Sequence, residues 1–222
     1  MSTLTLVRHG QAETFQQEGA VLTPAGEQQA AALARWWLAK GVRFDDVYTG
    51  ALVRQIQTEQ VIAQCFREAG QPWPDATRDP AWNEYDAPGV MEALGVKFER
   101  GGPDEKRRFQ AMFLGAMTRW IEGSIDAEGV ELWPAFRDRV SGALGRLMAG
   151  PSRRRIAVFT SGGPIGFSVH FAMKAPARTF LDVHWRVRNT SMTEFVFDRE
   201  RLTLDSFNCI HHLHDLGLHT YR

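Results

Sequence analysis

The stretch Thr3-Leu-Thr-Leu-Val-Arg-His-Gly-Gln-Ala12 decides the fold, because a run of apolar, strand-forming residues ends abruptly in Arg8-His9-Gly10. The run predicts a buried strand, and open α/β sheets bind ligands beyond the carboxyl ends of such strands. Gly10 has no Cβ, so a bulky anion can approach the backbone closely at this point. The stretch therefore predicts a phosphoryl-binding site beside a cation and an imidazole.

The composition of the 222 residues excludes several classes of protein. With 44% hydrophobic residues, 23% charged residues and a formal net charge of zero, nothing indicates a disordered, nucleic-acid-binding or membrane-surface protein. No run approaches the roughly eighteen apolar residues of a membrane span, and no leader-like segment is visible, so we expect a cytoplasmic protein without a membrane partner. Cys65 and Cys209 are too few for a disulfide framework and are expected to be reduced.

Beyond the first strand, strand-like and helix-like segments alternate. The patterns predict strands at 45–48, 76–78, 155–160, 190–197 and 201–207, and helices at 24–40, 51–69, 133–148 and 162–173. This alternation predicts a three-layer α/β/α sandwich with a mainly parallel central sheet. We expect residues 1–222 to form a single domain.

The stretch from about residue 80 to 130 interrupts the alternation. Prolines break the chain between Gly70 and Gly89, and Gly101-Gly102-Pro103 forms a second break. Apolar residues then recur at helical spacing, at Phe109, Met112, Phe113, Met117, Trp120 and Ile121. The pattern predicts a small helical cap inserted over the sheet.

Several segments, taken together, resemble a known family. The segment Leu6-Val-Arg-His-Gly-Gln11 resembles the N-terminal signature of the histidine phosphatase superfamily, in its phosphoglycerate-mutase-like branch. Further segments resemble the family in the same order: Leu22–Gln28, Tyr48–Thr58, Asn83-Glu84, Val158–Ile165, Asn189–Phe195 and Asn208–Leu213. The resemblance covers nearly the whole chain, and it implies the α/β fold predicted above and chemistry on phosphomonoesters.

Phosphoryl transfer needs a nucleophile, cations around the equatorial oxygens and an acid for the leaving group. The resemblance implies that His9 is the nucleophile, forming a phosphohistidine, and that Glu84, which we expect on an exposed loop, is the general acid. Asp86 stays open as the alternative acid. The expected phosphate-binding residues are Arg8, Gly10, Arg54, Ser161 and Gly162, the last two at a strand-to-helix turn whose backbone N–H groups favour anions.

Ser161 departs from the family pattern, which has a second histidine at this position. A hydroxyl can donate to a phosphate oxygen but brings no charge, and losing one transition-state donor costs on the order of 10²–10³ in rate. We therefore expect a phosphatase acting on a small phosphorylated substrate without a cofactor or metal, with activity lowered by Ser161. A phosphate-ester-binding protein with minimal catalysis and a phosphomutase remain alternatives.

Two other motifs suggest different chemistry. Ser161 lies between a strand and a helix, as the nucleophile of an α/β-hydrolase does, but Phe159 stands where that motif requires glycine. The cluster His211-His212-x-His214 has spacing that could hold a metal. We favour neither interpretation over the phosphohistidine one, and the sequence predicts no oligomeric state.

Overall fold

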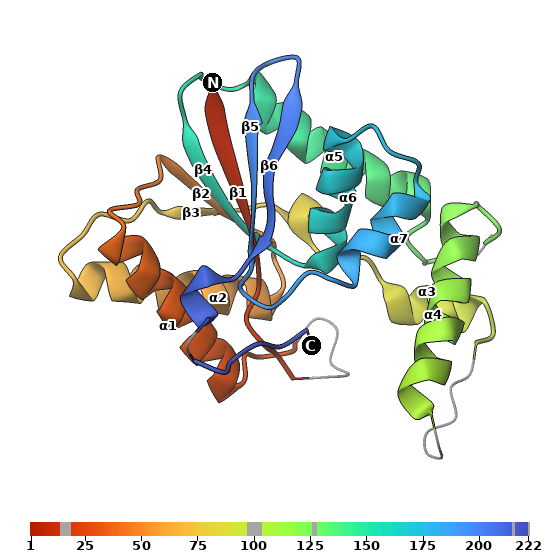
Figure 1. Cartoon of the computed structure of the whole chain (residues 1–222). Coiled ribbons are helices and arrows are strands. Elements are labelled where there is room, and N and C mark those ends of the chain that lie inside the picture. The colour runs from red at the N-terminus through yellow and green to blue at the C-terminus, as the bar shows by residue number, and fades with distance from the viewer. Residues whose placement is uncertain (14–18, 97–103, 126–127, 215, 222) are drawn as a thin grey trace.

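A computed structural model, which describes residues 1–13, 19–96, 104–125, 128–214 and 216–221, forms a six-stranded sheet with seven α-helices in that part of the chain (Figure 1). The strands are β1 (Ser2–Arg8), β2 (Asp46–Thr49), β3 (Ala76–Arg78), β4 (Arg155–Thr160), β5 (Met192–Phe197) and β6 (Leu202–Cys209). Their spatial order is β3-β2-β4-β1-β5-β6, with parallel pairing from β3 to β1 and antiparallel pairing at β5 and β6. The predicted mainly parallel sheet is confirmed.

Helices cover both faces of the sheet. The helices α1 (Pro24–Ala39) and α2 (Val53–Glu68) pack on one face, and α5 (Trp133–Ala149), α6 (Gly162–Ala172) and α7 (Arg178–His184) lie on the other (Figure 1). In β4, Val158 packs with the α5 side, whereas Phe159 packs with the α1 side. This two-residue alternation gives the sheet two apolar faces, which produces the predicted three-layer sandwich.

The interruption in the alternation contains η1 (Pro80–Trp82), α3 (Ala87–Ala93) and α4 (Glu105–Ile121). Figure 1 shows α3 and α4 at the edge of the molecule beyond α7. Met117 and Trp120 of α4 are 0% and 1% exposed, so the predicted apolar stripe packs into the larger core. The predicted break at 101–103 lies outside the described residues, and the assignment of residues 1–222 to one domain stays a prediction.

The register of the sheet brings the strand ends together. Arg8 pairs with Thr160 and Thr49 pairs with Phe159, so the residues that follow β1, β2 and β4 emerge at one edge. Ligands bind at this edge in open α/β sheets. The fold therefore places His9 and Ser161 side by side. Within the described residues, no helix has the length and apolarity needed to cross a membrane.

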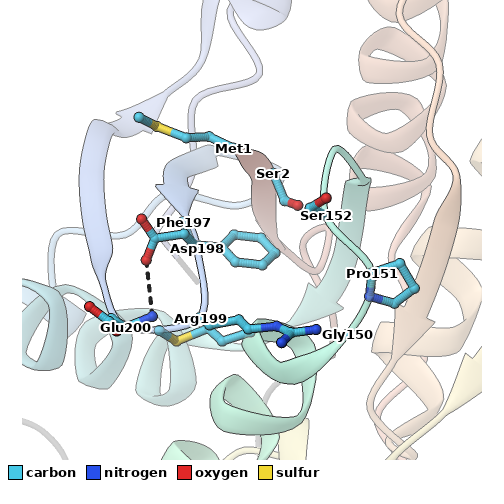
Figure 2. Close-up of a pocket in the computed structure, with 10 residues that line it drawn as sticks. Met1, Ser2, Gly150, Pro151, Ser152, Phe197, Asp198, Arg199 and Glu200 are labelled. Atoms are coloured by element: carbon cyan, nitrogen blue, oxygen red, sulfur yellow. Dashed lines mark hydrogen bonds between the residues drawn. The ribbon is translucent and has the colours of Figure 1, made fainter.

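A cavity of about 400 Å³ lies at the opposite edge, where β1 and β4 begin and β5 turns into β6. Figure 2 shows the Phe197 ring in this cavity and the Asp198 carboxylate, which accepts from Glu200 N at 2.9 Å. None of the predicted site residues lines it. The hollow and the predicted site thus lie at opposite ends of the sheet.

Candidate active site

His9 follows β1 directly and is only 7% exposed. Its Nδ1 lies 2.7 Å from Gly10 O, and because a carbonyl oxygen can only accept, Nδ1 carries the proton. The Nε2 lone pair is then the nucleophilic one. Asn189 Nδ2 donates to His9 O at 3.1 Å, and His9 N donates to Thr160 O at 2.9 Å, so the backbone is fixed as well.

Arg54, in the first turn of α2, reaches this lone pair. Its Nε donates to His9 Nε2 at 3.2 Å, and the residue is 8% exposed. Thr58, one turn later, donates to Arg54 O at 2.7 Å and accepts from Gly10 N at 2.9 Å. The start of α2 is therefore fastened to the turn after β1, which brings His9 and Arg54 together.

Gly10 makes close backbone contacts with both α2 and α1. Its N–H donates to Thr58 Oγ1 and is not directed at an anion. A Cβ at Gly10 would lie 2.5 Å from Gly26 O, so glycine is required by the close approach of α1. Gly10 therefore allows two backbones to pack together, and its assignment to the phosphate-binding residues stays a prediction.

The electrostatic setting of His9 favours neutral imidazole. Burial, together with the charges of Arg54 and Arg8, lowers the pKa of His9 well below its usual value of 6.5. The hydrogen bond to Gly10 opposes this change only in part. The ring is therefore neutral at physiological pH and can act as a nucleophile.

Arg8, the last residue of β1, is half-buried and held by backbone carbonyls. Its Nη1 donates to Val187 O and, at 2.7 Å, to Tyr221 O. The segment before Tyr221 is fixed in turn, because Thr220 Oγ1 donates to Asn189 Oδ1 at 2.9 Å. The charge of Arg8 acts on both His9 and Glu84, as their pKa changes show.

Glu84 does not lie on an exposed loop, and that expectation is wrong. The residue is half-buried, because its carboxylate packs against the start of α6. Gly163 N donates to Oε1 at 3.0 Å and to Oε2 at 3.2 Å. Burial raises the pKa of Glu84 above its usual value of 4.5, although the Gly163 hydrogen bond and the charges of Arg54 and Arg8 oppose the rise. A raised carboxyl pKa suits a proton donor.

Asp86, the alternative acid, has a structural partner. Its Oδ1 accepts from Gly89 N at 2.9 Å and so caps the N-terminus of α3. Glu84, by contrast, lies in the field of Arg54. The geometry favours Glu84 over Asp86.

Ser161 follows β4 and is the N-cap residue of α6, with 0% of its surface exposed. Its Oγ accepts from Gln55 Nε2 at 2.9 Å, and an amide cannot serve as a general base, so this contact gives the hydrolase-like interpretation no support. Gly162 comes next, and a Cβ there would lie 3.3 Å from His184 O. At this turn, where backbone N–H groups were expected to bind an anion, the Gly163 N–H donates to the Glu84 carboxylate.

Gln55 is a residue of the site that the sequence interpretation missed. It is fully buried, and its Nε2 donates both to Ser161 Oγ and, at 3.1 Å, to Trp82 O. Its Oε1 accepts from Leu52 N at 3.2 Å. One amide thus joins the start of α2, the end of η1 and the end of β4. In the sequence, its position directly after Arg54, at the start of a helix that begins at the site, was the feature that could have identified it.

In the cluster His211-His212-x-His214, His212 forms a hydrogen bond within the fold. His212 Nε2 lies 2.9 Å from Thr190 Oγ1, and burial lowers the pKa of His212 to about 4. The described residues contain no group of three or more His, Cys, Asp or Glu side chains that could hold a metal ion. The observed contacts therefore give the metal interpretation of 211–214 no support.

Comparison with known proteins shows the family of the chain. A family model described as the histidine phosphatase superfamily (branch 1) matches residues 4–210. A curated relative, the 2,3-bisphosphoglycerate-dependent phosphoglycerate mutase of Brucella ovis, is 40% identical over 92 residues. That match covers 38% of this chain and 42% of the relative, so it spans less than half of either protein.

Solved structures share the fold along nearly the whole chain. A mutant phosphoserine phosphatase from Entamoeba histolytica, in complex with phosphoserine, has a TM-score of 0.67 at 21% identity and covers 96% of this chain and 100% of its own. A putative alpha-ribazole-5'-P phosphatase from Escherichia coli gives 0.68 at 20% identity, covering 94% and 98%. A phosphoglycerate mutase from Bacillus anthracis gives 0.67 at 18%, covering 96% and 95%. At these identities, the likeness establishes the fold.

Proposed function

The chain belongs to the histidine phosphatase superfamily, and from this premise we propose that it hydrolyses small phosphomonoesters through a phosphohistidine formed on His9. The observation that carries the proposal is the 3.2 Å contact between Arg54 Nε and His9 Nε2. It places a guanidinium at the lone pair that would attack phosphorus, where a phosphoryl oxygen could replace the imidazole as its acceptor. Structural neighbours named as phosphatases support a small phosphorylated substrate.

The first step would form the phosphoenzyme. His9 Nε2 attacks phosphorus while the ester P–O bond breaks, and the leaving oxygen takes the proton of Glu84. Arg54 and Arg8 balance the charge on the phosphoryl oxygens. The raised pKa of Glu84 supports its role as the donor, and the lowered pKa of His9 supports its role as the nucleophile.

The second step would return the enzyme to its starting state. The Glu84 carboxylate accepts a proton from a water molecule, the water oxygen attacks phosphorus, and the P–N bond breaks to release inorganic phosphate. Within this scheme, we assign phosphate contacts to the hydroxyl of Ser161 and the backbone of Gly162. Both lie beside His9 through the pairing of β1 with β4. Because Ser161 is neutral and covered, we propose slow turnover.

The test compares wild type with His9→Ala in turnover of p-nitrophenyl phosphate. We expect the variant to lose activity by more than about 10³-fold, because the nucleophile is absent. Acid-labile labelling by a ³²P-phosphomonoester should appear in wild type and vanish in the variant. His214→Ala is the matched control, since His214 is exposed, and it should keep full activity. Equal rates in wild type and His9→Ala would end the proposal.

A phosphomutase is the second candidate, and the match to the Brucella mutase favours it. The same phosphohistidine would then transfer its phosphoryl group to a second hydroxyl and not to water. Incubating labelled enzyme with 3-phosphoglycerate separates the two. Release of inorganic phosphate supports the phosphatase, whereas label in a bisphosphate supports the mutase.

A phosphate-ester-binding protein with minimal catalysis is the third candidate. The observation that favours it is the Gln55–Ser161 hydrogen bond, in which a neutral hydroxyl occupies the position of the second histidine in the family pattern. Tight binding of several phosphomonoesters without turnover would support it. Strong activation by Ser161→His would point the same way.

A further inference from the structure

Arg139 lies on α5, outside the group of residues that face His9, yet its side chain contacts the segment that carries Glu84. Its Nη1 donates to Ala81 O and to Asn83 O, both at 2.8 Å, and its Nη2 reaches Glu84 O at 3.4 Å. A planar guanidinium can hold several acceptors in fixed directions at once. One side chain therefore fixes three carbonyls within four residues at the end of η1 and just beyond it.

Arg139 is itself fixed. Glu131 accepts from its Nε and, at 2.9 Å, from its Nη2, and the guanidinium lies 4.7 Å from the centre of the Phe136 ring. The side chains of Arg139 and Glu131 are 22% and 25% exposed. The guanidinium is thus held by a paired ionic contact and an aromatic face before it meets the segment.

The remaining carbonyl of the segment is also held. Trp82 O accepts from Thr160 Oγ1 at 2.6 Å and from Gln55 Nε2 at 3.1 Å. Every carbonyl from residue 81 to residue 84 therefore accepts from a side chain of another element. Since these residues form no strand ladder or α-helix, the side chains take over the role that backbone pairing has elsewhere.

The effect of Arg139 on Glu84 is geometric. The charges that act on the pKa of Glu84 are those of Arg54 and Arg8, and Arg139 is not among them. Its own charge is balanced by Glu131. Removing Arg139 would therefore displace the Glu84 carboxyl group from Gly163 N, whereas the charges that act on the pKa of Glu84 would stay in place.

We propose that Arg139 is a positioning residue for the general acid: it holds the backbone before Glu84 so that the carboxyl group meets the leaving oxygen. The inference rests on the proposed function, in which Glu84 is the acid. A misplacement of about 1 Å in a catalytic group can cost on the order of 10²-fold in rate. The loss should appear only where the leaving group needs a proton.

The experiment measures kcat/KM of Arg139→Met with two substrates. 2,4-Dinitrophenyl phosphate has a leaving group that departs without an acid, whereas an alkyl phosphate needs one. We choose kcat/KM because it reports the steps up to phosphoenzyme formation and leaves out hydrolysis. The variant should lose on the order of 10–10² on the alkyl ester and less than about 3-fold on the dinitrophenyl ester. Arg139→Lys should fall between, since one ammonium cannot hold both carbonyls.

Arg146→Met is the matched control. Arg146 lies on the same helix, and its Nη2 contacts Asp79 Oδ2 at 2.6 Å, just before η1. Asp79 Oδ1 accepts from Ala81 N, so this variant also removes an ionic contact next to the acid segment. It touches none of the carbonyls from 81 to 84, and both substrates should react at wild-type rates.

A second variant guards against misfolding. Arg139→Met leaves the Glu131 carboxylate without its cation. The double variant Arg139→Met/Glu131→Gln removes the carboxylate charge as well. Both variants should show the same leaving-group selectivity. Equal losses on both esters, or no loss, would overturn the role of Arg139. The proposed function fails separately, when His9→Ala keeps wild-type turnover in the same assay.

Discussion

The two ends of the sheet differ in how they fill space. At the carboxyl ends of β1, β2 and β4, buried polar side chains bind one another, and His9, Arg54 and Ser161 are 7%, 8% and 0% exposed. At the other end, a cavity of about 400 Å³ opens between Phe197 and the turn at Asp198 (Figure 2). The candidate active site is indicated by polar groups that converge on one point. The volume of a cavity is a poor guide to the position of that site in this protein.

The polar end also separates the pKa values of its groups. Burial lowers the pKa of His9 and raises the pKa of Glu84, so the same desolvation favours a neutral base and a neutral acid. Two groups whose environments displace their pKa values in opposite directions are a signature of acid–base and nucleophilic roles. The cavity end offers surface charges such as Arg199, which is exposed to water.

The largest effect expected at the polar end comes from Arg54→Met. Removing the guanidinium beside His9 Nε2 should lower kcat/KM by about 10³-fold, because the transition-state charge loses its nearest donor. Steady-state kinetics with an aryl phosphate measures this change. Arg67→Met, an exposed position on the same helix, is the control and should leave kcat/KM unchanged. A loss below about tenfold would remove Arg54 from the proposed mechanism.

Glu84→Gln should sharpen the comparison through its pH dependence. Glu84 donates its proton only when neutral, so kcat/KM should fall as pH rises through the raised pKa of Glu84. The amide variant should lose about 10²-fold on alkyl phosphates and should lack this alkaline decline. A pH profile from 5 to 9 measures both effects. An unchanged alkaline limb in the variant would assign the decline to another group.

His212→Gln tests whether a buried histidine near the polar end makes the free energy of unfolding depend on pH. The pKa of His212 is about 4 in the folded chain and about 6.5 unfolded. The unfolded chain therefore binds more protons between these values, and stability is lost as pH falls from about 6.5 to about 4. The full loss is about 3 kcal/mol, and Gln should remove it while keeping a partner for Thr190.

Urea unfolding at pH 7 and pH 4.5 measures this difference in the free energy of unfolding. His214→Gln is the control, because His214 is exposed. The wild type should lose about 2 kcal/mol more than His212→Gln between the two pH values. Equal losses of unfolding free energy in the wild type and His212→Gln would show that folding does not lower the pKa of His212.

The smallest effect is expected at the cavity end. Arg199→Ala removes an exposed charge at the rim of the cavity and should change kcat/KM by less than about twofold. Its free energy of unfolding should stay within about 0.5 kcal/mol of wild type, as for most exposed positions. A strong loss of turnover would break the distinction between the two ends.

The sequence predicts the parts of the fold that depend on local pattern. The first strand, the proline at the start of α1 and the alternation of elements follow from periodicity and capping, and the structure has them. The boundaries differ by small amounts: α2 begins at Val53 and not Ala51, because Leu52 is its N-cap residue, and β6 continues to Cys209. The convergence of His9 and Arg54 followed from the rule that parallel strands end at one edge.

The sequence could not predict the contacts that hold the site. Arg139 contacts Ala81 from 58 residues away, and Gln29 Nε2 donates to Thr220 Oγ1 across 191 residues. Such pairs depend on the packed arrangement of α5, α1 and the C-terminal segment, and no local periodicity encodes them. For the same reason, Glu84 was placed on an exposed loop, although the start of α6 covers it.

Gly163 offers a way to capture a bound ligand. A Cβ at this position would overlap Glu84 Oε1 and lie 2.7 Å from Tyr85 Cδ1, so Gly163→Ala should push the carboxyl group off the helix. His9, Arg8 and Arg54 would all stay intact. Under the proposed function, a single methyl group would then slow turnover while phosphoester binding is kept, which would suit the variant for ligand soaks of crystals and for isolating a bound ligand from a cell extract.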